Sequence, residues 1–282
     1  TMKLSTVKID GRTTWGIVDG DTFHDTGAVL IGRYGDLKAA IAGGLSGVAE
    51  ARQAATRHPC AALTWLAVIP NPDKILCVGL NYEMHRQETG RSVVENPTIF
   101  GRFANSQTGH LAPIVMPKVS SDLDYEGELA IIIGKAGRYI SREDALSHVA
   151  GYSIYNDGSV RDYQRHTHQF TPGKNFPDTG AFGPWMMTPD ELGPLESLRM
   201  QTRLNGQVVQ DATLDTMIFD VPRIIEYCSE FTRLEPGDVI ATGTPGGVGA
   251  KRNPPLWMRP GDIVEVEIDT LGILRNPIAA EA

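Results

Sequence analysis

The chain has 282 residues, of which 41% are hydrophobic and 21% charged, an ordinary composition for a globular protein of one or two domains. The formal net charge of −8 and the lack of a basic run argue against a nucleic-acid partner. No stretch approaches the roughly 20 apolar residues of a membrane span, and the first residues hold no run typical of a signal sequence. The three cysteines are widely spaced, which is typical of a reducing compartment. We therefore expect a cytoplasmic protein with no membrane partner.

The first 70 residues predict a small α+β domain. Short alternating strands meet at Asp19-Gly20, which is a hairpin signal. Residues 35–57 are rich in Ala, Leu and Glu and favour a helix, although three glycines interrupt it. A proline-rich turn at residues 66–73 indicates the boundary, so we expect domains at 1–70 and 71–282.

The larger domain reads as rich in strands. Asn205-Gly206 predicts a tight hairpin, and a helix is expected from 221 to 231 with Asp220 as its cap. Strands and helices do not alternate regularly, so the fold class is α+β rather than a parallel βαβ fold. The strands are expected at residues 129–133, 150–156, 199–204, 239–242 and 263–268.

Glu126 and Glu128 begin an apolar, β-branched run. Residues two apart in a strand point to the same face, where two carboxylates repel each other. Such a pair suits a hard divalent ion such as Mg²⁺. The alternative is a polar edge strand with two solvated glutamates, and the pair alone favours that alternative.

Two further groups could complete a site. Asp157 closes a strand before Gly158, where it is either a third metal ligand or an ordinary turn residue. His85 and Glu88 are three apart, so in a helical turn they would share a face and form a general base. A surface histidine with a glutamate nearby by chance is the alternative.

Two loops carry the remaining candidates. Lys174 lies between Gly and Pro residues and is either a solvated lysine or a positive charge for an anionic substrate or oxyanion. The glycine-rich segment 243–249 fits neither the phosphate-binding loop nor GxGxxG. Its glycines would let backbone amides and the Thr244 hydroxyl approach a ligand.

Five stretches, taken together and in order, resemble the fumarylacetoacetate hydrolase family. They are CVGLNYEMHRQE (77–88), DYEGELAIIIGK (124–135), GYSIYNDGSVRD (151–162), GKNFPDTGAFGPW (173–185) and LEPGDVIATGTPGGVG (234–249). The resemblance implies a mixed β-roll of stacked sheets and a homodimer.

The resemblance also implies roles for single residues. It implies Mg²⁺ or Mn²⁺ as cofactor, a catalytic dyad on a lid, a catalytic lysine, a threonine that contacts substrate and two residues that line the pocket. Glu126, Glu128 and Asp157 match the metal ligands, and His85 with Glu88 matches the dyad. Lys174 matches the catalytic lysine, and Thr244 matches the threonine that contacts substrate. Tyr155 and Arg161 match the residues that line the pocket.

One stretch departs from the family pattern. Many members carry Phe-x-Lys-Pro after the lid, whereas this chain has Phe100-Gly-Arg102-Phe103. We expect Arg102 to offer a bidentate fork to a substrate carboxylate.

The implied reaction is hydrolysis of a carbon–carbon bond in a small diketo acid. We expect an acylpyruvate hydrolase of aromatic-acid catabolism, with fumarylpyruvate or maleylpyruvate as substrate type. The same site would serve an oxaloacetate-type β-keto acid decarboxylase or a 2-hydroxymuconate-type isomerase. A metal-dependent dicarboxylate binder without catalysis is an alternative of another class.

Overall fold

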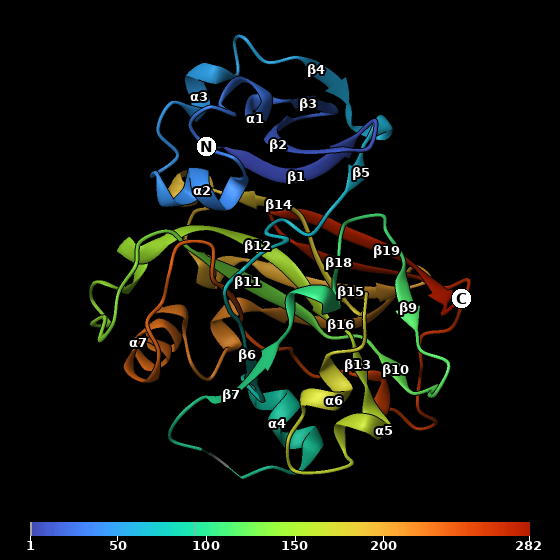
Figure 1. The fold of residues 1–282 in the computed structure, drawn as a ribbon. Helices are drawn as coiled ribbons and strands as arrows, with labels where there is room; N and C mark the ends of the chain where they lie inside the picture. Colours follow the sequence, from blue (N-terminus) through green and yellow to red (C-terminus); the bar gives the residue numbers. More distant parts are fainter. Residues whose placement is uncertain (1, 93) are drawn as a thin grey trace.

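The computed structural model describes residues 2–92 and 94–282, and its strands form two large sheets with few long helices (Figure 1). In this part of the chain the first sheet has twelve strands in the order β4-β3-β2-β1-β14-β12-β11-β17-β6-β7, with β5 beside β1 and β8 beside β14. Their bounds are β1 Lys3–Ile9, β2 Arg12–Asp19, β3 Thr22–His24, β4 Arg57–Pro59, β5 Thr64–Trp65, β6 Ile75–Gly79, β7 Thr98–Arg102, β8 Gln107–Thr108, β11 Gly127–Ile133, β12 Val149–Asp157, β14 Gly180–Met187 and β17 Val239–Ala241.

The second sheet has five strands in the order β16-β15-β18-β19-β9, and β10 pairs with β13 separately. The bounds are β9 Ile114–Met116, β10 Leu123–Asp124, β13 Ser159–Val160, β15 Arg199–Leu204, β16 Gln207–Thr213, β18 Ile263–Ile268 and β19 Gly272–Ala280. The α-helices are α1 Thr26–Val29, α2 Leu37–Ala42, α3 Val48–Ala51, α4 Glu83–Thr89, α5 Arg161–Gln164, α6 Thr171–Lys174 and α7 Val221–Phe231. The 3₁₀ helices are η1 Cys60–Ala62, η2 Ala104–Ser106, η3 Ala145–His148, η4 Pro189–Glu191, η5 Leu195–Ser197, η6 Leu214–Thr216 and η7 Gly249–Lys251. The expected strand-rich α+β class is confirmed.

Strand β11 lies at the centre of the molecule because both of its faces are apolar. Leu129 and Ile131 pack into the core shared with the second sheet, which contains Val266. Ala130 and Ile132 point the other way, into a core shared with the N-terminal strands and helices. This double burial explains why the sequence there reads as a continuous hydrophobic run.

The N-terminal strands extend the same twelve-stranded sheet. Strand β1 runs antiparallel to β14, with Lys3 opposite Met187 and Leu4 opposite Met186. Helical residues between 35 and 57 divide into α2 and α3, because the backbone turns at Gly44 and Gly47, which have φ values of 67° and 79°. The boundary at residue 70 stays a prediction.

Local signals in the second half are confirmed. Helix α7 spans the expected residues, and Asp220 accepts a hydrogen bond from the Arg223 backbone N–H at 2.9 Å. Asn205 and Gly206 join β15 to β16 with φ values of 50° and 80°, as the Asn-Gly signal predicts. In the described part of the chain, no helix is long and apolar enough to cross a membrane.

Three short helices gather at one end of the molecule. Figure 1 shows α4, α5 and α6 close together, at the end opposite the N-terminal strands. Strand β6 and the edge strand β7 lead to this end (Figure 1), and Glu126, just before β11, lines a cavity there. The central strands therefore deliver their polar terminal residues to one place.

Candidate active site

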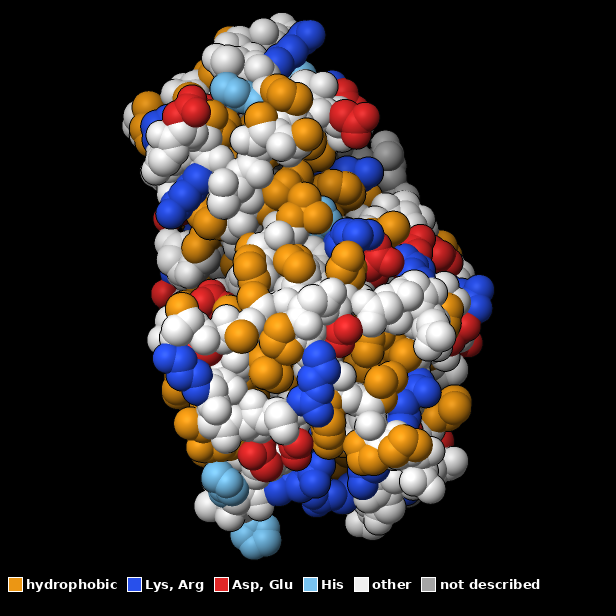
Figure 2. Space-filling model, turned by 90° about the vertical axis from the view of Figure 1, so that its right-hand side faces the viewer, with side chains coloured by type: hydrophobic (Ala, Val, Ile, Leu, Met, Phe, Trp, Pro, Cys, Tyr) orange, Lys and Arg blue, Asp and Glu red, His pale blue; other side chains and the backbone are white. Residues whose placement is uncertain are grey.

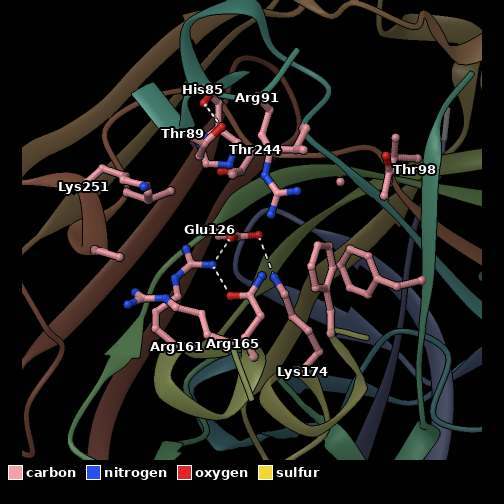
Figure 3. Close-up of a pocket in the computed structure, with 18 of the residues that line it drawn as sticks. His85, Thr89, Arg91, Thr98, Glu126, Arg161, Arg165, Lys174, Thr244 and Lys251 are labelled. Carbon is pink, nitrogen blue, oxygen red and sulfur yellow. Dashed lines mark hydrogen bonds and ion pairs between the residues drawn. The ribbon is translucent and has the colours of Figure 1, made fainter. Parts of the chain in front are cut away.

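A cavity of about 580 Å³ lies between α4, α5, α6 and the loop that leads into η7. Figure 3 shows Glu126 in the middle of the lining residues, with His85 and Thr244 on one side and Lys174 on the other. The cavity brings together residues from segments up to 173 positions apart, from Val78 to Lys251. A site of this kind is where ligands usually bind.

The acidic triad forms at the junction of β11 and β12. The two strands are antiparallel, with Glu128 opposite Tyr155, and the Asp157 backbone N–H donates to the Glu126 carbonyl at 2.9 Å. This register places Asp157 beside the two glutamates. Carboxylate oxygens of all three residues lie within 4.8 Å of one another, and all three residues are buried. The grouping predicted from the pair Glu126 and Glu128 is therefore present.

The charges of the triad are unequally compensated. Burial alone would raise the pKa of Glu126, but Lys174 and Arg161 lower it below its ordinary value. Burial, reinforced by Asp157 and Glu126, raises the pKa of Glu128. Glu128 accepts a hydrogen bond from the Gly243 backbone N–H at 2.8 Å, which replaces only part of the missing positive charge. Glu128 forms no ion pair with any described residue, and a hard divalent ion among the three buried carboxylates would supply that positive charge.

Lys174 bridges two members of the triad. Its Nζ donates to Glu126 Oε2 at 2.9 Å and to Asp157 Oδ2 at 2.7 Å. Burial opposes the charged form, but Asp157 and Glu126 raise the pKa of Lys174, so the ammonium stays protonated. An ammonium carries three N–H groups, so one remains for a ligand in the cavity.

Arg161 lies across the triad from Lys174. Its Nε donates to Asp124 Oδ2 at 2.8 Å, and its Nη1 lies 2.7 Å from Glu126 Oε1. The buried Nη2 has no hydrogen-bond partner among the described residues, although Arg161 lines the cavity. A buried donor without a partner is costly, and an anionic ligand would satisfy it. Arg161 lies at the pocket wall, which is the position that the family resemblance implies.

Arg102 does not lie where we expected it. Its Nη1 donates to Asp157 Oδ1 at 2.5 Å and to the Gly158 carbonyl at 2.9 Å, and its Nη2 donates to Thr179 Oγ1 at 2.8 Å. The side chain is fully buried and is absent from the cavity lining. We expected the Arg102 guanidinium to bind a substrate carboxylate, and this expectation is wrong. The guanidinium instead binds Asp157 from outside the cavity. Gly180 leaves room for it, since an added Cβ would lie 2.6 Å from Nη2.

Tyr155 is also placed differently from the expectation. It is buried on β12, its ring lies 5.3 Å from that of Phe182, and it does not line the cavity. Burial raises the pKa of its phenol, so Tyr155 is a neutral side chain beside the triad, on the strand position opposite Glu128. Arg102 stacks near the same ring, with 6.0 Å between its Cζ and the ring centroid.

Helix α4 carries the expected dyad. The His85 Nδ1–H donates to Glu88 Oε1 at 2.7 Å, as a spacing of three residues allows in a helix. Burial opposes ionisation, but the hydrogen bonds from His85 and from the Gly247 backbone N–H lower the pKa of Glu88. The ionised carboxylate fixes the tautomer of His85, which leaves the other ring nitrogen, Nε2, as a proton acceptor. His85 lines the cavity.

The glycine-rich loop binds the protein's own carboxylates. Backbone N–H groups of Gly243, Gly247 and Gly249 donate to Glu128, Glu88 and Asp124 at 2.8, 3.0 and 2.8 Å respectively. Thr244 lines the cavity, but its hydroxyl donates to the Gly127 carbonyl and accepts from Gln210. These three amides therefore position acidic groups of the protein itself, and the expected contact of Thr244 with a ligand stays a prediction.

The residues that sequence reasoning missed include three cations and a glutamine of the cavity wall and one aspartate behind it. Asp124 accepts hydrogen bonds from the Arg161 side chain and from the backbone N–H groups of Gly249 and Ala250. The available signal was that Asp124 lies close to Glu126 in the sequence. For Arg165 the signal was a spacing of four from Arg161, which places both on one face of a helical turn. The three cations and the glutamine are Arg91, Arg165, Lys251 and Gln164.

Known proteins with similar sequences include oxaloacetate tautomerases. The mitochondrial oxaloacetate tautomerase fahd2 of Xenopus laevis is 42% identical over 218 residues, 77% of this chain and 68% of that protein. The oxaloacetate tautomerase YisK of Bacillus subtilis is 44% identical over 217 residues, 75% of this chain and 72% of that protein.

Solved structures of similar fold include hydrolases. The fumarylacetoacetate hydrolase of Exiguobacterium antarcticum superimposes with a TM-score of 0.87 at 35% identity, over the full length of both chains. The maleylpyruvate hydrolase of Sphingobium sp. SYK-6 gives a TM-score of 0.83 at 28% identity, over 99% of this chain and 100% of that one. The model of the fumarylacetoacetate hydrolase C-terminal domain matches residues 74–279, so the chain belongs to the fumarylacetoacetate hydrolase family.

Proposed function

We propose that the protein is a metal-dependent enzyme that cleaves a carbon–carbon bond in acylpyruvates. The observation that carries the proposal is the His85–Glu88 dyad, because His85 lines the same cavity as Glu126 of the acidic triad. A histidine held by a carboxylate activates water, and activated water is what hydrolysis needs.

The inner end of the cavity supplies the groups that bind a 2-oxo acid. Glu126, Glu128 and Asp157 would hold Mg²⁺ or Mn²⁺, which supplies Lewis-acid polarisation of the carboxylate and 2-oxo oxygens. The unpartnered Nη2 of Arg161 would donate to the same carboxylate. The third N–H of Lys174 would donate to oxygen atoms on which negative charge develops.

The dyad would then carry the hydrolytic step. His85 Nε2 takes a proton from water while Glu88 stabilises the imidazolium at Nδ1. The water oxygen bonds to C4 of the substrate, the C3–C4 bond breaks, and its electron pair passes to C3. Protonation of C3 gives pyruvate, and the acyl group leaves as a carboxylic acid. One water is consumed, and no oxidant or reductant is needed.

Oxaloacetate tautomerisation is the second candidate. It is favoured by relatives of 42% and 44% identity with that name. In this reaction the same dyad would move a proton between C3 and the 2-oxo oxygen, and no bond between carbons would break. Decarboxylation of oxaloacetate and isomerisation of 2-hydroxymuconate-type acids use the same enolate chemistry, so the acidic triad alone does not separate these reactions.

A substrate panel separates the candidates. The purified protein with Mg²⁺ or Mn²⁺ is given acetylpyruvate, maleylpyruvate, fumarylpyruvate and freshly prepared enol-oxaloacetate, and enol absorbance is followed together with product identity. Hydrolysis gives pyruvate and a second acid from an acylpyruvate. Tautomerisation removes the enol signal of oxaloacetate without pyruvate, and decarboxylation gives pyruvate and CO₂ from it. Binding of oxalate with no turnover of any compound would contradict an enzyme and favour a dicarboxylate binder. The homodimer stays a prediction that light scattering would test.

A further inference from the structure

Tyr125 and Arg252 meet at the backbone carbonyl of Gly247, beside the cavity rather than in its wall. The Tyr125 hydroxyl donates to this carbonyl oxygen at 2.9 Å. Arg252 Nε donates to the same oxygen at 3.2 Å and to the Tyr125 hydroxyl at 3.1 Å. Arg252 Nη2 donates to the Val209 carbonyl of β16 at 2.7 Å. The Gly247 carbonyl therefore accepts two side-chain donors, although neither of these side chains lines the cavity.

Arg252 differs from an ordinary surface cation in what it contacts. Figure 2 shows Lys and Arg side chains gathered at the lower end of the molecule, where Figure 1 places α4 and α5, so a cation near this end is not unusual by itself. Arg252 forms no ion pair with any residue that the structure describes, and it donates instead to two backbone carbonyls and a phenol. A charged donor makes a stronger hydrogen bond than a neutral one, so Arg252 fixes the backbone at Gly247.

The glycine-rich loop needs such support because residues 242–248 lie between β17 and η7, outside the helices and strands. Gly247 has a φ of 102°, and an added Cβ would lie 2.2 Å from the Val209 carbonyl oxygen, so the position requires glycine. Glycine itself permits many backbone conformations. The contacts of Tyr125 and Arg252 therefore select the one that the loop adopts.

The N–H side of the same loop faces Glu88. The Gly247 N–H donates to Glu88 Oε2 at 3.0 Å. Burial opposes the ionisation of Glu88, but hydrogen bonds from His85 and from Gly247, together with the nearby Val248 N–H, lower its pKa. The Gly247 carbonyl and the Val248 N–H belong to one planar peptide unit, so holding the oxygen also sets the direction of that N–H. Donors on a carbonyl oxygen also polarise the peptide and strengthen its N–H as a donor.

We infer that Tyr125 and Arg252 are positioning residues of the reaction. By holding the Gly247 carbonyl they aim the adjacent N–H groups at Glu88, and Glu88 in turn keeps the proton of His85 on Nδ1. The inference rests on the proposed function, in which His85 is the base, and it applies to hydrolysis and to tautomerisation alike.

Steady-state kinetics with Mn²⁺, on acetylpyruvate and on enol-oxaloacetate, test this role. Tyr125→Phe removes only the hydroxyl, and Arg252→Met removes the guanidinium. We expect each substitution to lower kcat about 5-fold, because the base is misaligned but still present, while KM and Mn²⁺ affinity stay within about twofold.

The chain offers a matched control for each variant. The Tyr34 hydroxyl donates to the Ser46 carbonyl, and the Arg259 guanidinium donates to the Ser121 carbonyl, so both hold a backbone carbonyl of another segment. Tyr34→Phe and Arg259→Met are expected to keep the kcat of the wild-type protein. Values of kcat in Tyr125→Phe and Arg252→Met that equal those of the controls would overturn the inference.

A double-mutant cycle with Glu88→Ala separates positioning of the dyad from general support of the fold. If Arg252 acts through Glu88, Arg252→Met lowers kcat by less than about 1.5-fold in the Glu88→Ala background. An undiminished loss in that background would show a route that does not involve Glu88 and would overturn the inference. Tyr125→Phe changes a single atom and carries the same cycle if Arg252→Met does not fold.

A proton resonance of His85 tests the positioning without turnover. In protein with isotope-labelled histidine, the Nδ1–H that is bonded to Glu88 should give a downfield signal, assigned by its absence from His85→Gln. We expect this signal to broaden in Tyr125→Phe and Arg252→Met and to persist in the two controls. A signal that is unchanged in both variants would overturn the inference. Failure of the wild-type protein to turn over either substrate would instead overturn the proposed function, on which the signal does not depend.

Discussion

The floor of the cavity, which we define as the acidic triad with Lys174 in the cavity and Arg102 behind Asp157, and the helix α4 are held in different ways. Both carry proposed catalytic groups. On the floor, buried Lys174 makes two charged hydrogen bonds to the acidic triad, and Arg102, buried behind Asp157, makes one. On α4, the Met84 side chain is 70% exposed, and Glu88 is tied to the glycine-rich loop by one backbone hydrogen bond from Gly247. Regions with few buried contacts open most easily. The floor is therefore preorganised, whereas α4 is suited to open and close.

Loss of a floor carboxylate should have the largest effect. Glu126→Gln keeps the shape of the side chain but removes the charge that Lys174 and Arg161 compensate. We expect metal affinity to fall at least about 100-fold and turnover about 1,000-fold, because a bound metal supplies several kcal/mol to the reaction. Calorimetric titration with Mn²⁺ and initial rates measure the two effects. The exposed Glu50→Gln is the control. Full metal affinity and rate in Glu126→Gln would mean that the triad is not a metal site.

Arg102→Met tests whether the floor depends on the cation behind Asp157. The pair is fully buried, so removing Arg102 leaves Asp157 with Lys174 as its remaining cation among the described residues. We expect the unfolding free energy to fall by about 3 kcal/mol. Arg142→Met breaks the exposed pair with Asp220 and should cost less than about 1 kcal/mol. Urea denaturation measures both. Similar losses of unfolding free energy in the two variants would show that the buried pair contributes no more than an exposed pair, and would contradict a preorganised floor.

The role of Arg102 also shows where sequence reasoning stops. The hairpin at Asn205 and the cap at Asp220 were predictable because a turn or a helix start depends on residues close in the chain. The triad was predictable in part, since strand alternation relates Glu126 to Glu128. No local pattern shows that Arg102 lies behind Asp157, 55 residues away. The pairing of β1 with β14 joins residues that are still farther apart in the chain, so the order of the sheet could not be read from the sequence.

On α4, His85→Gln should slow the reaction without weakening the metal site. The general base is lost while the floor stays complete, so we expect kcat to fall about 100- to 1,000-fold and Mn²⁺ affinity to remain within about twofold. Initial rates and calorimetric titration on the same sample check both parts. The exposed His166→Gln should behave as the wild-type protein. An unchanged yield of pyruvate from His85→Gln would remove His85 from the mechanism.

Glu88→Gln should have the smallest effect, because it weakens the dyad and the attachment of α4 without removing the base. We expect kcat to fall about 10-fold and the backbone N–H groups of α4 to exchange faster with deuterium. The lowered pKa of Glu88 determines how its contribution to the stability of the protein varies with pH. The stabilisation from its ionised form is fully present above the ordinary glutamate pKa of about 4.3 and is lost as the pH falls through the lower folded value.

The difference in thermal stability between the wild-type protein and Glu88→Gln should therefore be largest at neutral pH and shrink on the acid side. Glu83→Gln is the matched control, since Glu83 lies on the same helix and pairs with Arg86 at the surface. Its amide exchange in α4 should change less than that of Glu88→Gln, because Glu83 makes no bond to the glycine-rich loop. Equal exchange in the two variants would show that the bond from Gly247 to Glu88 does not hold α4 closed. In that case α4 would be held by the packing of its buried residue His85 instead.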